Sequence, residues 1–142
     1  MSEILVNKLT GTSTAGSIAV TGEGNSTTTN LQQGLAKAWL NINQTSTQAI
    51  RDSFNVSSIS DSGTGRTLVT VSNAFSNNDY LATIALRMQS TVSNSGSSGG
   101  VDTSDGSTSI TTTQHQLSYI NTGSTGDADT PYGGSSIQGD LA

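Results

Sequence analysis

The sequence predicts an all-β protein: an antiparallel β-sandwich, jelly-roll-like, preceded by an N-terminal β arm. Three observations predict it. The chain of 142 residues is rich in Thr, Val and Ile, whose branched Cβ atoms suit a pleated sheet. Short alternations of apolar and polar residues recur, with turn signals about every eight to twelve residues, as in sandwiches and barrels. Only 11% of the residues are charged and one is proline, whereas disordered chains are usually rich in both.

The composition also indicates a thin core. Apolar residues make up 31% of the chain and aromatic residues 4%, which is low for a globular domain. Two interpretations are open: part of the chain is disordered, or the fold completes its core against other copies of itself. The abundance of strand-forming residues favours the second interpretation.

Residues 1–30 are predicted to form an attachment and oligomerisation arm, and residues 31–142 the sandwich module. Two short strands are expected in the arm, at 3–10 and 17–21. Short strands with free edges can add to a neighbouring sheet, so the arm is predicted to dock on another protein. The alternative is a tail that packs on its own domain. The candidate docking residues are the apolar ones: Ile4, Val6, Leu9, Ile18 and Val20.

Residues 30–43 allow two interpretations. Asn30 could cap a helix that contains Leu31 and Leu35 on one face, but Gly34 weakens it. A strand from about 36 to 43 is the better interpretation. The only tryptophan, Trp39, is then expected to fill the core.

Further strands are expected after this one, among them 67–72, 80–90 and 110–120. Residues 61–66 predict a tight turn, because Gly63 and Gly65 tolerate positive φ and Asp61 can accept backbone hydrogen bonds. Residues 93–109 are rich in Gly and Ser and predict an exposed loop, and 122–134 predict another. The last residues predict a short strand or tail. The expected core consists of large apolar side chains: Trp39, Phe54, Val56, Leu68, Val69, Ile84 and Leu86.

Catalytic and metal-binding patterns are weak. The only histidine, His115, has no orienting carboxylate nearby in the sequence, and there is no cysteine, so neither a catalytic triad nor a zinc site is indicated. Paired aspartates in the two loops could bind calcium or form ordinary solvated turns. We expect no enzyme activity, no cofactor and no metal. The loops could instead face a receptor, with the alternative that they are merely solvated. The receptor-facing candidates are Asp102, Asp105, Asp127, Asp129 and Tyr132.

Charge and hydropathy exclude other partners. The net charge is -5 and the five basic residues are scattered, so no nucleic-acid interface is expected. No apolar run is long enough to insert in a membrane, and no signal peptide is expected.

Three segments resemble a module that recurs in tail-fibre and related virion proteins of tailed bacteriophages, of the marine and cyanobacterial type. They are GLAKAWLNIN (34–43), AIRDSFNVSSISDSGTG (49–65) and the ending GDLA (139–142). These motifs are structural, so no active residue carries over.

The resemblance implies a structural protein of the phage particle, made in the host cytoplasm and trimeric like many phage fibres. As a tail fibre or adhesin it would dock by its arm and present loops toward a host glycan or surface protein. The alternative is a capsid decoration protein or head fibre that stabilises the shell, and a third option is a carbohydrate-active enzyme.

Overall fold

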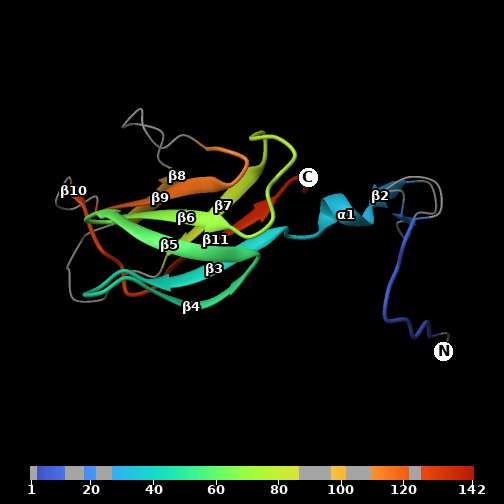
Figure 1. Cartoon of the computed structure of the whole chain (residues 1–142), viewed down its shortest axis with the longest axis horizontal. Coiled ribbons are helices and arrows are strands. Elements are labelled where there is room, and N and C mark those ends of the chain that lie inside the picture. Colours follow the sequence, from blue (N-terminus) through green and yellow to red (C-terminus); the bar gives the residue numbers. More distant parts are fainter. Residues whose placement is uncertain (1–2, 12–17, 22–26, 87–96, 102–109, 122–125) are drawn as a thin grey trace. The chain divides into compact units, whose positions relative to one another are not determined.

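The computed structural model describes residues 3–11, 18–21, 27–86, 97–101, 110–121 and 126–142 (Figure 1). The chain divides into two compact units, Met1–Leu35 and Ala36–Ala142. The division falls after Leu35, five residues later than the boundary expected from the sequence.

Unit 1 contains one small hairpin and one helical turn. Strands β1 (Ala19–Thr21) and β2 (Thr28–Asn30) pair in antiparallel fashion, and α1 (Leu31–Gly34) follows directly. The Asn30 Oδ1 accepts a hydrogen bond of 2.8 Å from the Gln32 N–H, which is the cap that the helical interpretation required. The structure thus contains both alternatives, a helical turn and then a strand. No helix of the described residues is long and apolar enough to cross a membrane.

The strand expected at residues 3–10 is wrong, because the described residues of this segment form no strand. Alternating apolar residues do not make a strand by themselves, since a strand needs backbone partners along an edge. The strand expected at 17–21 is present as β1.

Unit 2 consists of two antiparallel sheets that face each other, as in a β-sandwich (Figure 1). Sheet I has the order β4-β3-β11-β7. Sheet II has the order β5-β6-β9-β8, and β10 pairs with the last two residues of β9. The strands are β3 (Ala38–Asn43), β4 (Ala49–Phe54), β5 (Val56–Gly63), β6 (Arg66–Val71), β7 (Leu81–Leu86), β8 (Ser97–Val101), β9 (Gln114–Asn121), β10 (Gly126–Asp127) and β11 (Gly133–Gln138).

The predicted antiparallel all-β fold is therefore confirmed, but the strand order is not that of a jelly roll. A jelly roll places its first two strands in different sheets, whereas β3 and β4 are neighbours in sheet I and β5 and β6 are neighbours in sheet II. The chain changes sheets between β4 and β5, with no loop longer than one residue.

That residue is Asn55, which has a positive φ of 57°. Asn tolerates this left-handed conformation better than most residues do. Its side chain fixes the corner: Nδ2 donates to the Lys37 carbonyl at 3.0 Å, and Oδ1 accepts from the Asn73 N–H at 2.8 Å. One continuous segment therefore links an edge of sheet I to an edge of sheet II.

The core consists of two clusters of side chains that come from both sheets. One contains Ala38, Val71, Phe75, Tyr80 and Ile137, and the other contains Leu40, Ile42, Val69, Leu117 and Tyr119. Of the residues expected in the core, Val69 is buried, and Val56, Ile84 and Leu86 pack against the second cluster.

Trp39 and Phe54 were expected in the core, and both placements are wrong. Trp39 is 37% exposed and Phe54 is 53% exposed, because β3 points its Leu40 and Ile42 side inward. Leu68 is also misplaced: it alternates with the buried Thr67 and Val69 and stays half-buried on the other side of β6.

Glycine-rich and serine-rich segments form two strands that the sequence did not predict clearly. β8 lies inside the segment expected to be an exposed loop, and it pairs with β9 over five residue pairs. β11, expected to be a short strand or tail, pairs with both β3 and β7 in the middle of sheet I.

Two substitutions test which side of β3 faces the core. Ile42→Ala should lower the free energy of unfolding by about 2–5 kcal/mol, because Ile42 is fully buried. Trp39→Ala should cost less than Ile42→Ala, because 37% of the Trp39 surface stays exposed in the folded chain. Urea unfolding of the two variants and the parent chain measures both values. A Trp39→Ala cost equal to that of Ile42→Ala would show that another molecule covers the indole.

Candidate functional site

The predicted docking residues lie in unit 1. Ile4, Val6 and Leu9 are exposed in the segment without a strand, Val20 is exposed in β1, and Ile18 is half-buried. The Ile18 carbonyl accepts a hydrogen bond of 2.8 Å from the Leu31 N–H, which holds α1 against the residue before β1. Four of the five candidates thus present apolar side chains to the surroundings.

The acidic candidates divide into two groups. Asp102 and Asp105 lie outside the described residues. Asp127 forms an ion pair of 2.7 Å with the Arg66 Nε, and the Asp129 Oδ1 accepts a hydrogen bond of 2.7 Å from the Gly65 N–H. Both carboxylates therefore hold the 126–130 segment against the turn between β5 and β6.

The predicted turn between β5 and β6 is confirmed in detail. Gly63 and Gly65 have positive φ values of 122° and 70°. The Asp61 Oδ1 accepts a hydrogen bond of 2.8 Å from the Gly63 N–H. A Cβ atom at Gly65 would lie 2.6 Å from two backbone atoms, so this close approach requires glycine.

Behind this turn lies a network of buried amides and hydroxyls. The Gln44 Nε2 donates to the Thr67 Oγ1 at 2.9 Å, and that hydroxyl donates to the Gln48 Oε1 at 2.7 Å. The Thr130 N–H donates to the Gln44 Oε1 at 3.1 Å. These neutral groups satisfy one another and join the β3–β4 turn to β6 and to the 126–132 segment. Among the described residues, no group of three or more His, Asp or Glu side chains could hold a metal ion.

Tyr132 is the candidate that faces outward with a fixed ring. Its side chain is 40% exposed, and the Arg51 guanidinium lies over the ring, 4.4 Å from its centroid. The Arg51 Nη2 also donates to the Pro131 carbonyl at 2.9 Å. This cation–π contact and the hydrogen bond keep the ring beside the start of β11.

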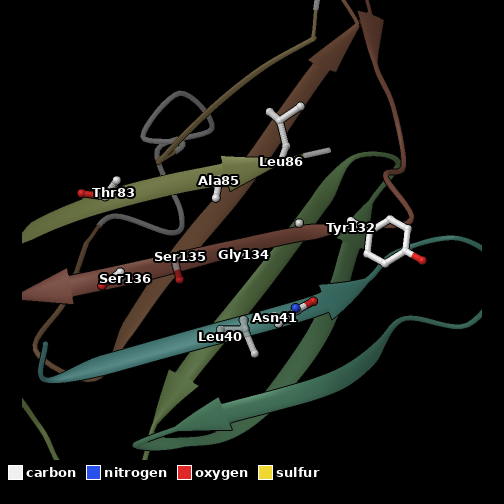
Figure 2. A pocket seen from close by; sticks show the side chains of 10 residues that line it. Leu40, Asn41, Thr83, Ala85, Leu86, Tyr132, Gly134, Ser135 and Ser136 are labelled. Atoms are coloured by element: carbon white, nitrogen blue, oxygen red, sulfur yellow. The ribbon is translucent and has the colours of Figure 1, made fainter. Parts of the chain in front are cut away.

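Tyr132 stands at one end of an open groove on the outer face of sheet I (Figure 2). The groove has a volume of about 390 Å³ and runs over β11, between β3 and β7. β11 contributes small residues, Gly134 and Ser136, and a hollow forms over it between the neighbouring strands, where Leu40 and Leu86 line it. Other residues that line it are Asn41, Thr83, Ala85 and Tyr132.

The strand register extends this surface sideways. Ser136 is paired with Thr83 on one side and with Trp39 on the other, and Trp39 is paired with Phe54. The two exposed aromatic side chains therefore follow directly from the groove across β3 and β4. This face was not predicted from the sequence, because Trp39 was expected to fill the core.

His115 belongs to β9 of sheet II, and its side chain is buried between the sheets, on the inner side of sheet I. Its Nε2 is 3.4 Å from the Ser135 Oγ of the facing sheet, and its Nδ1 has no hydrogen-bond partner. The Tyr80 ring packs edge-on against the imidazole, with 6.4 Å between the ring centroids. Burial lowers the pKa of His115 to about 4, because the apolar surroundings disfavour the imidazolium.

Hydrogen bonds from its hydroxyl group hold the Tyr80 side chain in place. Its hydroxyl donates to the carbonyls of Thr111 and Gln114, each at 3.1 Å, and burial raises the Tyr80 pKa to about 12. The histidine and its neighbours are thus a neutral, closed cluster between the sheets, with no carboxylate among the contacts described here.

Comparisons with protein-family models, with curated proteins and with solved structures find no match for this chain. The resemblance to phage fibre proteins therefore stays a prediction from the sequence segments that carry it.

The buried imidazole predicts a pH-dependent stability. Above pH 6.5 His115 is neutral in both the folded and the unfolded chain. Below 6.5 the unfolded chain binds a proton that the folded chain refuses, so the free energy of unfolding falls as pH falls. The loss reaches about 3 kcal/mol near pH 4, at about 1.4 kcal/mol per pKa unit.

Urea unfolding between pH 7.5 and pH 4 measures this loss, with His115→Leu as the control. The variant should lack the part of the pH dependence that His115 causes, while carboxylates contribute equally to both proteins. Parallel pH profiles for the two proteins would contradict the assignment.

Proposed function

We propose that this chain is a structural protein of a tailed-phage particle, of the tail-fibre or adhesin type. Unit 1 attaches it to another virion protein, and unit 2 is the folded module that it presents toward the host. The chain is made in the host cytoplasm and resides in the particle. One observation carries the proposal, namely the difference in burial between the two units.

Unit 1 buries none of its described residues, although many of them are apolar. Ile4 and Leu5 are each 83% exposed, and Leu9 is 61% exposed. Unit 2, in contrast, has two apolar clusters of its own. Burial of apolar surface is the main favourable term in protein association, so unit 1 gains most from a partner surface.

The backbone of unit 1 favours the same role. A hairpin of two three-residue strands is marginal by itself in water. Its unpaired edges have N–H and C=O groups that a neighbouring sheet can bind. Attachment by strand addition would satisfy these groups and cover the apolar side chains together.

A homotrimer is the proposed state of the assembled protein, by the resemblance to phage fibres. Unit 1 offers a surface for self-association as well as for attachment, because Ile4, Leu5 and Leu9 are exposed. Light scattering of the full chain should give three chain masses, and a stable monomer at micromolar concentration would contradict the trimer.

The proposed role is binding, not catalysis. The only histidine is buried and its nearest hydroxyl, on Ser135, is buried as well. A nucleophile and its base must both reach a substrate, and these two groups face the interior.

Capsid decoration is the second candidate, and the same difference in burial favours it. A decoration protein would also attach through an apolar arm, but to the shell. Copy number separates the two: a few trimers per particle at the tail, or scores to hundreds on the head. Imaging of labelled particles determines both number and place.

Removal of residues 1–35 tests the attachment role of unit 1. The remaining residues, 36–142, keep both apolar clusters and should unfold cooperatively. They should be absent from purified particles, whereas the full chain is incorporated. Quantitative mass spectrometry of the particles gives the copy number.

Leu81→Ser in the full chain is the matched control, because it removes an exposed aliphatic side chain from unit 2 instead. This variant should be incorporated normally. Incorporation of 36–142 at the level of the full chain would refute docking through unit 1.

A further inference from the structure

The outer face of sheet I combines aromatic rings with small and polar residues. In one row across the strands lie Thr83, Ser136, Trp39 and Phe54, each paired with the next. The next row contains Ala85, Gly134, Asn41 and Asp52. Tyr132, directly before the start of β11, lies at one end of the groove (Figure 2).

The groove exists because the central strand lacks bulk. A Cβ atom at Gly134 would lie 2.3 Å from the Leu40 carbonyl oxygen, so only glycine fits the close approach of β11 to β3. The floor is therefore low between Asn41 and Ala85. At about 390 Å³ the groove falls within the usual range for small-molecule sites.

Its hydrogen-bonding groups are neutral. The Asn41 amide and the hydroxyls of Thr83 and Ser136 offer donors and acceptors, and no charged side chain lines the groove. The nearest described cation, Arg51, lies over the Tyr132 ring and donates to a carbonyl. With a net charge of -5 for the chain, an anionic ligand has little to attract it.

We propose that this groove binds a neutral oligosaccharide. A sugar ring has one face of C–H groups and an edge of hydroxyls. The negatively polarised faces of aromatic rings attract C–H groups, and the amide and hydroxyls of the groove match the sugar hydroxyls. Tyr132 stacks on one sugar unit, and Trp39 and Phe54 extend the contact to further units along the row.

The proposal deepens the adhesin role, since it gives the host-facing ligand a chemical class. It also moves the binding surface away from the acidic loop residues, because Asp127 and Asp129 already have partners within the chain. Of the receptor-facing candidates that the structure describes, Tyr132 is the one that lines the groove.

The single tryptophan makes the test specific. Because Trp39 is the only one in the chain, its fluorescence reports on this face alone. The full chain is titrated with neutral hexasaccharides of β-1,4-glucose, α-1,4-glucose, mannose and N-acetylglucosamine, and with a hexamer of galacturonate as the anionic comparison. At least one neutral sugar should change the Trp39 emission in a saturable way.

Two variants locate the binding. Tyr132→Ala should raise the Kd about tenfold or more by removing the stacking ring. Thr83→Tyr should abolish binding by filling the groove from the edge strand β7. Ser58→Tyr is its matched control, because it adds the same ring at an exposed position on the edge strand β5 of the other sheet. Urea unfolding shows whether each variant is folded. If Thr83→Tyr does not fold, the affinity of Tyr132→Ala alone tests whether the sugar binds in the groove.

Several results would overturn the proposal. They are no response to any neutral sugar, a response to the galacturonate hexamer alone, unchanged affinity in Tyr132→Ala, and Trp39 emission that depends on protein concentration but not on sugar. None of them concerns incorporation into particles, so failure here is distinct from failure of docking through unit 1.

Discussion

The pairing of β11 with both of its neighbours is the constraint on which the sandwich depends. Without β11, sheet I would separate into the β3–β4 hairpin and a lone β7. The pairing is close: a Cβ atom at Gly134 would meet a backbone oxygen of β3, and one at Gly133 would lie 2.7 Å from the Tyr119 hydroxyl of the facing sheet. The two glycines at the start of β11 are therefore a requirement of this close packing, although glycine is a poor strand former elsewhere.

The same strand shapes both sides of sheet I. Inward, Ser135 places its hydroxyl near the buried imidazole of His115, and Ile137 belongs to the apolar core. Outward, Gly134 and Ser136 leave the groove open. The apolar core is thin, and hydrogen bonds among Gln44, Gln48, Thr67 and Thr130 supplement it at one end. These groups are uncharged and bind one another, so this polar part of the interior is satisfied.

Much of the fold could be predicted from local pattern, and the failures have physical reasons. Alternation located β3, β6, β7 and β9, and turn chemistry located Gly63 and Gly65. Trp39 was turned inward because of its size, although it shares a strand face with Asn41, and Leu40 and Ile42 share the other. β8 and β11 have little side-chain signal, since their pairing is made by the backbone. Residues 3–10 have the signal but pair with no strand in the described part of the chain.

The candidate site was harder to predict, because register brings together residues that are far apart in the chain, such as Trp39, Thr83 and Ser136. What distinguishes it from unit 1 is chemistry. The exposed large apolar residues of unit 1 are all aliphatic, and its β1–β2 hairpin pairs with no other described strand, which suits burial against protein. The exposed rings of sheet I lie beside amides and hydroxyls, which suits a ligand with alternating apolar faces and polar edges. Exposed apolar surface is costly in both places, and its neighbours indicate what kind of partner offsets that cost.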